Sequence, residues 1–304
     1  MKLTNSPVDK VNLFGRPFFI KRDDLLHPKF SGNKARKFKA LLDNDFPAVK
    51  QLVGFGSCQA NSLYSLSSLA QSKSWSFSFF VDRIPEHLKS NPIGNYKAAL
   101  VQGADVQVFP VALKGDVEKE AWLRQKYANN PEVLVVPEGG RSDLARYGVH
   151  QLAEEITQWA LEKNQIPLTV FLPSGTGTTA LFLQEFFTSK NIDIQVLTCA
   201  VVGDVQYLKH QFNLLIDNDH LYPEILSTPQ RFHFGKLNKK LYDTWCEANM
   251  SGIEFELLYD PVGLITLKHH LHELMNTSIL YIHQGGILAN ETMLLRYKRK
   301  YNIE

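Results

Sequence analysis

A lysine near the N-terminus combines an inward position with a helical setting, the pattern expected of a reactive amine. Residues 31–42 read SGNKARKFKALL, and Phe38, Leu41 and Leu42 form the apolar stripe of the predicted helix. Lys34 precedes Phe38 by four residues, so its side chain shares that inward face. A buried, unpaired ammonium normally loses its proton, and a neutral lysine amine is a nucleophile. The alternative is that Lys34 reaches solvent from the edge of the core, as part of a solvated basic turn.

The first turn of this helix carries basic side chains where the helix macrodipole disfavours cations. Residues 31–33 form a predicted turn and cap. Lys34, Arg36 and Lys37 follow at once, and such placement makes sense if an anion docks beside them. Arg36 and Lys39 are expected to point away from the apolar stripe.

A loop rich in glycine and hydroxyl side chains follows a predicted strand and precedes a predicted helix. Residues 174–179 read SGTGTT, and their backbone N–H groups, together with the helix N-terminus, suit an anion. One interpretation is a site for a single phosphate monoester. A second is a loose dinucleotide fingerprint, Gly175-x-Gly177-x-x-Ala180, with Asp204 as its acidic residue. A third is a strand-to-helix turn without a ligand.

Composition excludes several classes of function. The chain has 304 residues, of which 44% are hydrophobic and 21% charged, which is typical of a globular protein. Its net charge of +2 is too small for a general nucleic-acid-binding surface. No apolar run reaches the roughly 18 residues of a membrane helix, and the N-terminus lacks the apolar stretch of a signal peptide. Cys58, Cys199 and Cys246 fit neither a zinc site nor a disulfide framework, so we predict no metal and a reducing, cytoplasmic compartment.

Apolar strand-like segments alternate with helical stretches along the chain. This alternation predicts an α/β fold with parallel sheets covered on both faces, and the length predicts two such units. Ligands in these folds bind at the carboxyl ends of strands, where the 174–179 loop is expected. Strands are expected at 48–55, 76–81, 105–109, 133–137, 169–173, 194–202 and 278–283, and helices at 61–72, 91–101, 143–163 and 179–187.

Seven short motifs occur in a fixed order along almost the whole chain. They are KRDDL (21–25), SGNKARK (31–37), Gln59-Ala60-Asn61, PEGG (137–140), SGTGTT (174–179), DPV (260–262) and HQGG (283–286). Together they resemble the family of 1-aminocyclopropane-1-carboxylate deaminase and D-cysteine desulfhydrase, pyridoxal-phosphate enzymes of the tryptophan-synthase-β (type II) fold. The resemblance implies two open parallel-sheet sandwiches. We expect a small domain over 48–145 and a large cofactor domain made of 1–47 and 146–304.

The resemblance also assigns roles to individual positions. Lys34 matches the lysine that carries the cofactor covalently, Asn33 its neighbour, and Lys37 a cation near the phosphate. Asn61 matches the asparagine that binds the cofactor's 3′ oxygen. The phosphate loop corresponds to Ser174, Gly175, Thr176, Gly177 and Thr178. The substrate carboxylate is expected at the helix N-terminus formed by Ser57, Cys58, Gln59, Ala60 and Asn61, where free N–H groups suit an anion.

Three positions depart from the family pattern. Ala60 stands where the family has a serine whose hydroxyl lies near the reacting carbon. Gly263 and Leu264 stand where the family has a tyrosine followed by glutamate or threonine, so an aromatic hydroxyl and the usual partner of the pyridine nitrogen are missing. Candidates to replace them are Tyr259, Thr266, His283 and Gln284.

The resemblance implies an enzyme that uses pyridoxal 5′-phosphate to convert a small amino acid into an α-keto acid and ammonia. The substrate is expected to be D-cysteine or a similar amino acid, or 1-aminocyclopropane-1-carboxylate, and the enzyme a homodimer without nucleic-acid or membrane partners. Two alternatives remain. The departures favour a pyridoxal-phosphate-binding protein with altered or lost activity. An NAD(P)-binding protein would use the 175–180 loop but leaves Lys34 unexplained.

Overall fold

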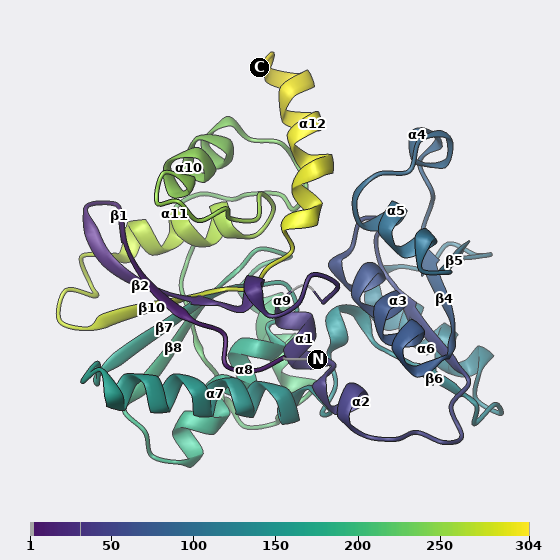
Figure 1. Ribbon diagram of the computed structural model, residues 1–304, viewed down its shortest axis with the longest axis horizontal. Coiled ribbons are helices and arrows are strands. Elements are labelled where there is room, and N and C mark those ends of the chain that lie inside the picture. The colour runs from purple at the N-terminus through teal and green to yellow at the C-terminus, as the bar shows by residue number, and fades with distance from the viewer. Residues whose placement is uncertain (1–2, 31, 304) are drawn as a thin grey trace.

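Two β-sheets lie side by side and divide the chain between them (Figure 1). The structure, a computed structural model, describes residues 3–30 and 32–303. The larger sheet takes its six strands from both ends of the described chain. In spatial order these are β1 (Val8–Leu13), β2 (Arg16–Arg22), β10 (Ser278–His283), β7 (Leu168–Ser174), β8 (Ile194–Ala200) and β9 (Glu224–Ile225). Neighbouring strands are parallel except β1 and β2, which form an antiparallel hairpin.

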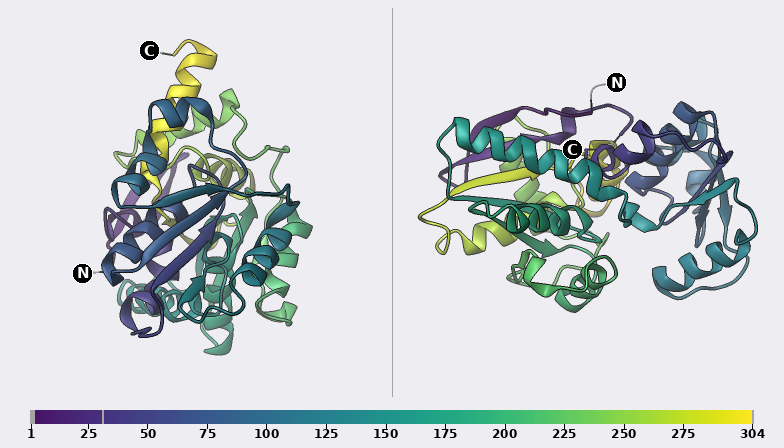
Figure 2. Two further views of the ribbon diagram at one scale, coloured as in Figure 1. Left: turned by 90° about the vertical axis from the view of Figure 1, so that its right-hand side faces the viewer. Right: turned by 90° about the horizontal axis from the view of Figure 1, so that it is seen from below.

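The smaller sheet is wholly parallel and comes from the stretch between β2 and β7. Its strands, in spatial order, are β5 (Asp105–Val108), β4 (Ser76–Val81), β3 (Gln51–Phe55) and β6 (Val133–Val135). One face packs against α3 (Asn61–Lys73) and α5 (Gly94–Val101), and the other against α6 (Gly115–Lys126). Figure 2 shows this sheet and its helices to one side of the larger sheet. The predicted parallel sheets flanked by helices are therefore confirmed, while the domain limits at 48 and 145 stay a prediction.

The larger sheet is covered by α7 (Ala145–Glu162), α8 (Thr178–Ser189), α10 (Lys239–Asn249) and α11 (Asp260–His270). Val170 and Leu172 pack with α7 and α8, whereas Phe171 between them packs with α10 and α11. Successive side chains of a strand point to opposite faces. Both faces of this sheet are therefore buried, as is usual for parallel sheets.

The remaining helical segments connect these layers. They are α1 (Asn33–Lys37), α2 (Lys39–Asp43), α4 (Glu86–Ser90), α9 (Val205–Asn213) and α12 (Asn290–Tyr301), with 3-10 turns at Asp23–Leu25, Glu138–Gly140, Asp219–Leu221 and Ile287–Ala289. Within the described ranges, no helix has both the length and the apolar character needed to cross a lipid bilayer.

The helix predicted over 31–42 is not continuous. It breaks at Phe38, which has φ −95° and ψ 5° and ends α1 immediately before α2 begins. The predicted cap residue Ser31 lies outside the described residues, and Gly32 is the residue that precedes α1. The break leaves Phe38 and Leu41 buried together, so the apolar stripe survives in two short helices.

Candidate active site

A buried network of charges fixes α1 in place. The guanidinium of Arg36 donates to both carboxylate oxygens of Asp23, at 2.8 and 3.0 Å, and to both of Glu155 on α7, at 2.6 and 2.8 Å. Lys21 of β2 lies 2.7 Å from the same Glu155 carboxylate. Arg36 is only 1% exposed. Arg36 is buried without belonging to the apolar stripe, because two carboxylates inside the protein neutralise it.

Helix α7 approaches α1 so closely that no side chain fits between them. A Cβ atom on Gly148 would lie 2.1 Å from the carbonyl oxygen of Arg36. Gly148 interrupts an otherwise regular helical pattern, and close packing against α1 is the physical reason for a glycine at this position.

Lys34 is buried, and in the described part of the chain no carboxylate forms an ion pair with it. Its Nζ lies 3.3 Å from Oδ1 of Asn33. Burial lowers the pKa of Lys34 to about 8, although the Glu138 carboxyl acts in the opposite direction. The amine is therefore largely neutral in mildly alkaline solution. The alternative of a solvated basic turn is wrong, since Lys34, Arg36 and Lys37 are all buried.

Asn33 ties the start of α1 to the ends of two central strands. Its backbone N–H donates to the carbonyl oxygen of Gln284 at 3.0 Å, and its side-chain amide donates to Oε1 of Gln284 at 3.1 Å. The Gln284 amide in turn donates to the carbonyl oxygen of Pro173 at 2.7 Å. Gln284 follows β10, and Pro173 lies at the end of β7. The reactive amine is thus held at the carboxyl edge of the larger sheet.

Lys37 lies beside the predicted phosphate loop. Its Nζ donates to the carbonyl oxygen of Gly139 at 3.1 Å, and a Cβ atom on Gly139 would lie 3.0 Å from Cγ2 of Thr176. Burial lowers the pKa of Lys37 well below its ordinary value, and the neighbouring charges of Lys34 and Arg141 lower it further. An anion at the loop would compensate this concentration of positive charge.

The 174–179 loop has the geometry of an anion cradle. Gly177 has φ +68° and precedes α8, and Cβ contacts to Phe212 and Leu208 would be 2.4 and 2.6 Å, so only glycine fits. Thr176 and Thr178 share a hydrogen bond of 3.0 Å between their hydroxyls. Free N–H groups at the start of α8 remain available for a phosphate.

Two hydroxyls of this loop have hydrogen bonding that the sequence did not predict. The hydroxyl of Ser174 lies 2.6 Å from that of Thr198 between β7 and β8, so this side chain is already paired within the sheet. The hydroxyl of Thr179 is buried without a hydrogen-bond partner. Thr179 was absent from the predicted site, although its place in the SGTGTT motif was a usable signal. A buried orphan hydroxyl beside an anion cradle indicates a ligand contact.

The predicted substrate loop forms the N-terminus of α3. Ala60 precedes Asn61, the first helical residue, and no side chain caps this end. The N–H of Leu63 donates to the carbonyl oxygen of Ala60, which leaves the N–H groups of Asn61 and Ser62 for a ligand. Asn61 accepts a hydrogen bond from the amide of Asn95 at 2.9 Å. Cys58 donates to the carbonyl oxygen of Arg83, and burial raises the pKa of its thiol. Cys58 is therefore a packed thiol rather than a nucleophile.

Glu138 connects Lys34 with this loop. A Cβ atom built on Gly56 would lie 3.5 Å from Oε1 of Glu138 and 3.7 Å from Cβ of Ala60. Burial and the nearby Asp116 carboxyl raise the pKa of Glu138 to about 8. A carboxyl group that can exchange a proton near neutral pH thus lies close to the position of the missing serine hydroxyl.

Gly263 and Leu264 lack polar side chains, but the hydroxyl of Tyr259 lies near the phosphate loop. Leu264 is fully buried in the core beneath the sheet, and Gly263 lies against Pro173 and Phe171. A phenol lies one turn earlier in the chain, on Tyr259. The hydroxyl of Tyr259 would be 3.3 Å from a Cβ atom on Gly175 in the phosphate loop.

The other candidates for these roles are already engaged. Thr266 donates to the carbonyl oxygen of Val262 at 2.8 Å. His283 pairs with the carbonyl oxygen of Glu254 at 2.8 Å and stacks on Phe255. Gln284 holds Asn33 and Pro173, as described above.

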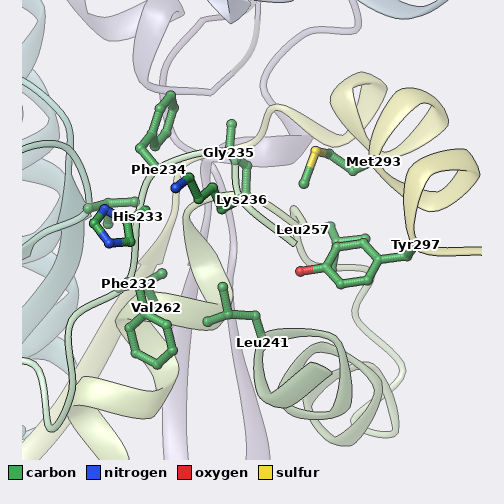
Figure 3. A pocket seen from close by; sticks show the side chains of 12 residues that line it. Phe232, His233, Phe234, Gly235, Lys236, Leu241, Leu257, Val262, Met293 and Tyr297 are labelled. Carbon is green, nitrogen blue, oxygen red and sulfur yellow. The ribbon is translucent and has the colours of Figure 1, made fainter. Parts of the chain in front are cut away.

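A separate hollow lies beneath the 232–236 segment, next to α10, α11 and α12 (Figure 3). Its walls are mostly apolar, and Figure 3 shows Leu241, Val262, Met293 and Tyr297 around it. It offers about 10 Å³, which is roughly the space of one water molecule. None of the predicted site residues lines it, and it is too small for an amino acid.

The residues described above fit pyridoxal phosphate as a group. Lys34 offers a buried amine, whose pKa is lowered to about 8, for its aldehyde carbon. Lys37, the free N–H groups of α8 and the orphan hydroxyl of Thr179 suit a phosphate. Asn61 lies against Gly286, where a Cβ atom would be 2.6 Å from the Asn61 amide nitrogen, so a side chain at position 286 would displace this amide.

Comparison with known proteins finds similarity to proteins that carry the names of such enzymes, although no family model matches the chain. It is 27% identical over 301 residues to a Pyrococcus horikoshii protein assigned as a 1-aminocyclopropane-1-carboxylate deaminase, covering 90% of this chain and 85% of that one. It is 24% identical over 338 residues to an assigned mitochondrial D-cysteine desulfhydrase of Oryza sativa, covering 94% and 82%. The chain is related to both groups.

A solved structure agrees with this relationship. The crystal structure of a 1-aminocyclopropane-1-carboxylate deaminase homologue superimposes with a TM-score of 0.79 at 20% identity, covering 97% of this chain and 95% of the other. The fold is therefore that of the type II pyridoxal-phosphate enzymes, as the motif resemblance implied.

Replacing Thr179 with valine separates the stability of the protein from its affinity for the cofactor. The apoprotein should gain about 1 kcal/mol, because valine keeps the shape and removes a buried unpaired hydroxyl. Pyridoxal phosphate should bind about tenfold more weakly, because one ligand of the phosphate is lost. Urea unfolding and fluorescence titration measure the two effects.

Thr266→Val is the matched control, since the Thr266 hydroxyl is buried but already bonded to Val262. It should lose stability slightly and bind the cofactor as the wild type does. Unchanged cofactor affinity in Thr179→Val would show that this hydroxyl is not a phosphate ligand.

The pKa of Lys34 predicts a pH-dependent stability difference. Its pKa is about 8 in the folded protein and 10.5 ordinarily, so between these values the unfolded chain binds more protons. The stability of the wild-type apoprotein should therefore rise with pH in this window. Lys34→Met lacks the proton and should be more stable than wild type near pH 7, with a smaller advantage near pH 10.

Urea unfolding of both apoproteins at the two pH values measures this difference. Lys89→Met, at an exposed lysine paired with Glu86, controls for the loss of a surface amine. An advantage of Lys34→Met that stays constant with pH would contradict the lowered pKa.

Proposed function

We propose that this chain is a pyridoxal-phosphate-dependent enzyme that converts a small amino acid into an α-keto acid and ammonia. The observation that carries the proposal is the buried amine of Lys34, with a lowered pKa and without an ion-pair partner among the described residues. A structural lysine would be paired or solvated. A lysine poised to bond covalently to an aldehyde needs a neutral amine, and this burial supplies it.

The residues around Lys34 divide the binding tasks. Lys37 and the start of α8 hold the phosphate, and Asn61 orients the ring through its 3′ oxygen. The free N–H groups at the start of α3 bind the carboxylate of the substrate. Pyridoxal phosphate itself supplies an electron sink for the pair of electrons left at Cα. The amine of Lys34 would move a proton at Cα of the substrate.

Glu138 provides a second group for proton transfer. Its carboxyl lies beside the loop that contains Ala60, and the charge of Lys34 acts to lower the pKa of this carboxyl. A carboxyl with a pKa of about 8 can both donate and accept a proton near neutral pH. It therefore occupies the part of the site in which the family serine would act.

The substrate preference follows from the departures. Opening a cyclopropane ring needs more from the protein than β-elimination does, because no good leaving group departs. Proton transfer by a positioned group is typically worth about 10²–10⁴ in rate, and Ala60 and Gly263 lack two such groups. We therefore assign D-cysteine, or a similar amino acid with a leaving group on Cβ, as the better substrate; sulfide would then be released with the ammonia.

An NAD(P)-binding function has less support. Its acidic residue would be Asp204, whose carboxylate instead accepts a hydrogen bond from the N–H of Tyr207 and caps α9. This function also gives Lys34 no role. A binding protein without turnover remains the second candidate, because Ala60 and Gly263 remove hydroxyl groups that the family has.

A homodimer and a cytoplasmic location complete the proposal. The three cysteines are free thiols, which suits a reducing compartment. Sedimentation of the purified protein tests the dimer.

Covalent labelling identifies the lysine that binds the cofactor. Borohydride reduction of the holoprotein followed by peptide mapping should place the label on Lys34. Lys34→Met should stay unlabelled and colourless, whereas Lys39→Met, which removes a lysine paired with Asp43 on α2, should label normally. A label on another lysine would refute the assignment.

Steady-state kinetics test the substrate class. We expect keto-acid release from D-cysteine or β-chloro-D-alanine with a kcat/KM at least tenfold above that for 1-aminocyclopropane-1-carboxylate. L-cysteine and D-serine complete the panel. An equal or higher value for the cyclopropane would overturn the preference. No turnover of any substrate by a protein labelled at Lys34 would favour the binding protein.

A further inference from the structure

The turn before α11 contains the carboxyl group of Glu256, of which only one oxygen has a hydrogen-bond partner. Oε2 of Glu256 accepts a hydrogen bond of 2.5 Å from the N–H of Tyr259, and the N–H of Glu256 donates to Oδ2 of Asp260 at 2.9 Å. These two bonds tie the turn to the start of α11, whose first residue is Asp260. The other oxygen of Glu256, Oε1, is buried and has no partner, although the residue is only 1% exposed.

An unpaired buried oxygen of this kind is costly, so it points to a missing ligand. Burial and the charge of Asp260 raise the pKa of Glu256 to about 8. Near neutral pH the group therefore holds a proton that a basic atom could accept. The backbone N–H groups of Leu258 and Asp260 also lower the pKa of this carboxyl, but neither makes a hydrogen bond with Oε1.

The position of Glu256 is set by two contacts. A Cβ atom on Gly286, which has φ +92°, would lie 3.3 Å from Cγ of Glu256 and 2.6 Å from the amide nitrogen of Asn61. Three residues after Glu256, Tyr259 places its hydroxyl against Gly175 in the phosphate loop. The turn from Glu256 to Tyr259 thus lies against Gly286 and Asn61 at one end and against the phosphate loop at the other.

We propose that Oε1 of Glu256 is the hydrogen-bond partner of the pyridine nitrogen, an inference that rests on the proposed function. In pyridoxal phosphate the ring nitrogen lies opposite the aldehyde carbon, on the edge between the 3′ oxygen side and the phosphate arm. With the aldehyde carbon at Lys34, the 3′ oxygen at Asn61 and the phosphate at 174–179, that edge faces the turn from Glu256 to Tyr259.

The proton moves only between Glu256 and the ring nitrogen, so no third group gains or loses one. The carboxyl of Glu256 gives its proton to, or shares it with, the ring nitrogen, and one hydrogen bond joins them in either state. A protonated ring is the stronger electron sink. In the family, the partner of the pyridine nitrogen lies at the position where this chain has Leu264. Here the partner would come from the turn that precedes α11.

Nitrogen NMR of the holoprotein reads this contact without any turnover. With ¹⁵N-labelled pyridoxal phosphate, the wild type should show a protonated or strongly hydrogen-bonded ring nitrogen. Glu256→Gln keeps an oxygen for the N–H of Tyr259 but has no acidic proton, so its ring nitrogen should shift to the unprotonated range. Glu254→Gln is the control, since the Glu254 carboxyl is exposed and bonded to Asn290. Equal nitrogen shifts in wild type and Glu256→Gln would overturn the proposal.

Cofactor analogues locate the contact on the ring. The wild type should bind pyridoxal phosphate at least tenfold more tightly than its 1-deaza analogue, and Glu256→Gln should lose most of that discrimination. If Glu256→Gln instead changes discrimination against the 3-deoxy analogue only, Glu256 contacts the 3′ oxygen and the proposal is wrong.

Borohydride labelling of the same samples separates this inference from the proposed function. Label on Lys34 with no effect of Glu256→Gln would refute the inference alone. Absence of label on Lys34 in the wild type would refute the proposed function, and the inference with it.

Discussion

The amine of Lys34 is enclosed by protein without a counter-ion in the described chain, and the rest of the site depends on this constraint. A short helix of five residues cannot hold a lysine in such a place by itself. The pairing of Arg36 with Asp23 and Glu155 supplies the anchorage, because breaking a buried ion pair leaves uncompensated charge inside the protein. One side chain of α1 thus secures the helix, and its neighbour two positions earlier is the amine to which we assign the chemistry.

The two sheets contribute different halves of the site. The smaller sheet ends β3 at the loop that leads into α3 and so supplies Asn61 and free N–H groups. In the larger sheet, β7 leads into the 174–179 loop and β10 into the turn that contains Gly286, which we propose to lie beside the phosphate and the ring. All three loops follow the carboxyl ends of parallel strands, where helix N-termini and irregular backbone gather. The carboxyl ends of the two sheets thus bear one candidate anion site each, and Lys34 is held at that of the larger sheet through Asn33 and Gln284.

Local signals made part of this predictable. The four-residue spacing of Lys34 and Phe38 indicated a buried lysine, and the glycine loop between an apolar strand and helix indicated β7 and α8. The hairpin of β1 and β2 was missed, although Phe14 and Gly15 turn it with positive φ angles. Glu256 could not have been found, because its spare oxygen becomes evident only when Gly286 and Asn61 are brought beside it by the fold. The pairing of Arg36 likewise joins residues up to 119 positions apart.

Gly148 carries a consequence for attempts to stabilise this protein. Glycine within a helix is ordinarily a favourable target, since alanine there gains roughly 0.5–1 kcal/mol of helix propensity. At this position an added methyl group would meet the backbone of α1 at 2.1 Å and would displace the helix that carries the reactive lysine. A substitution chosen from helix propensity alone would thus shift the position of Lys34. Gly148 affects the candidate site in this way although it is not one of the candidate site residues.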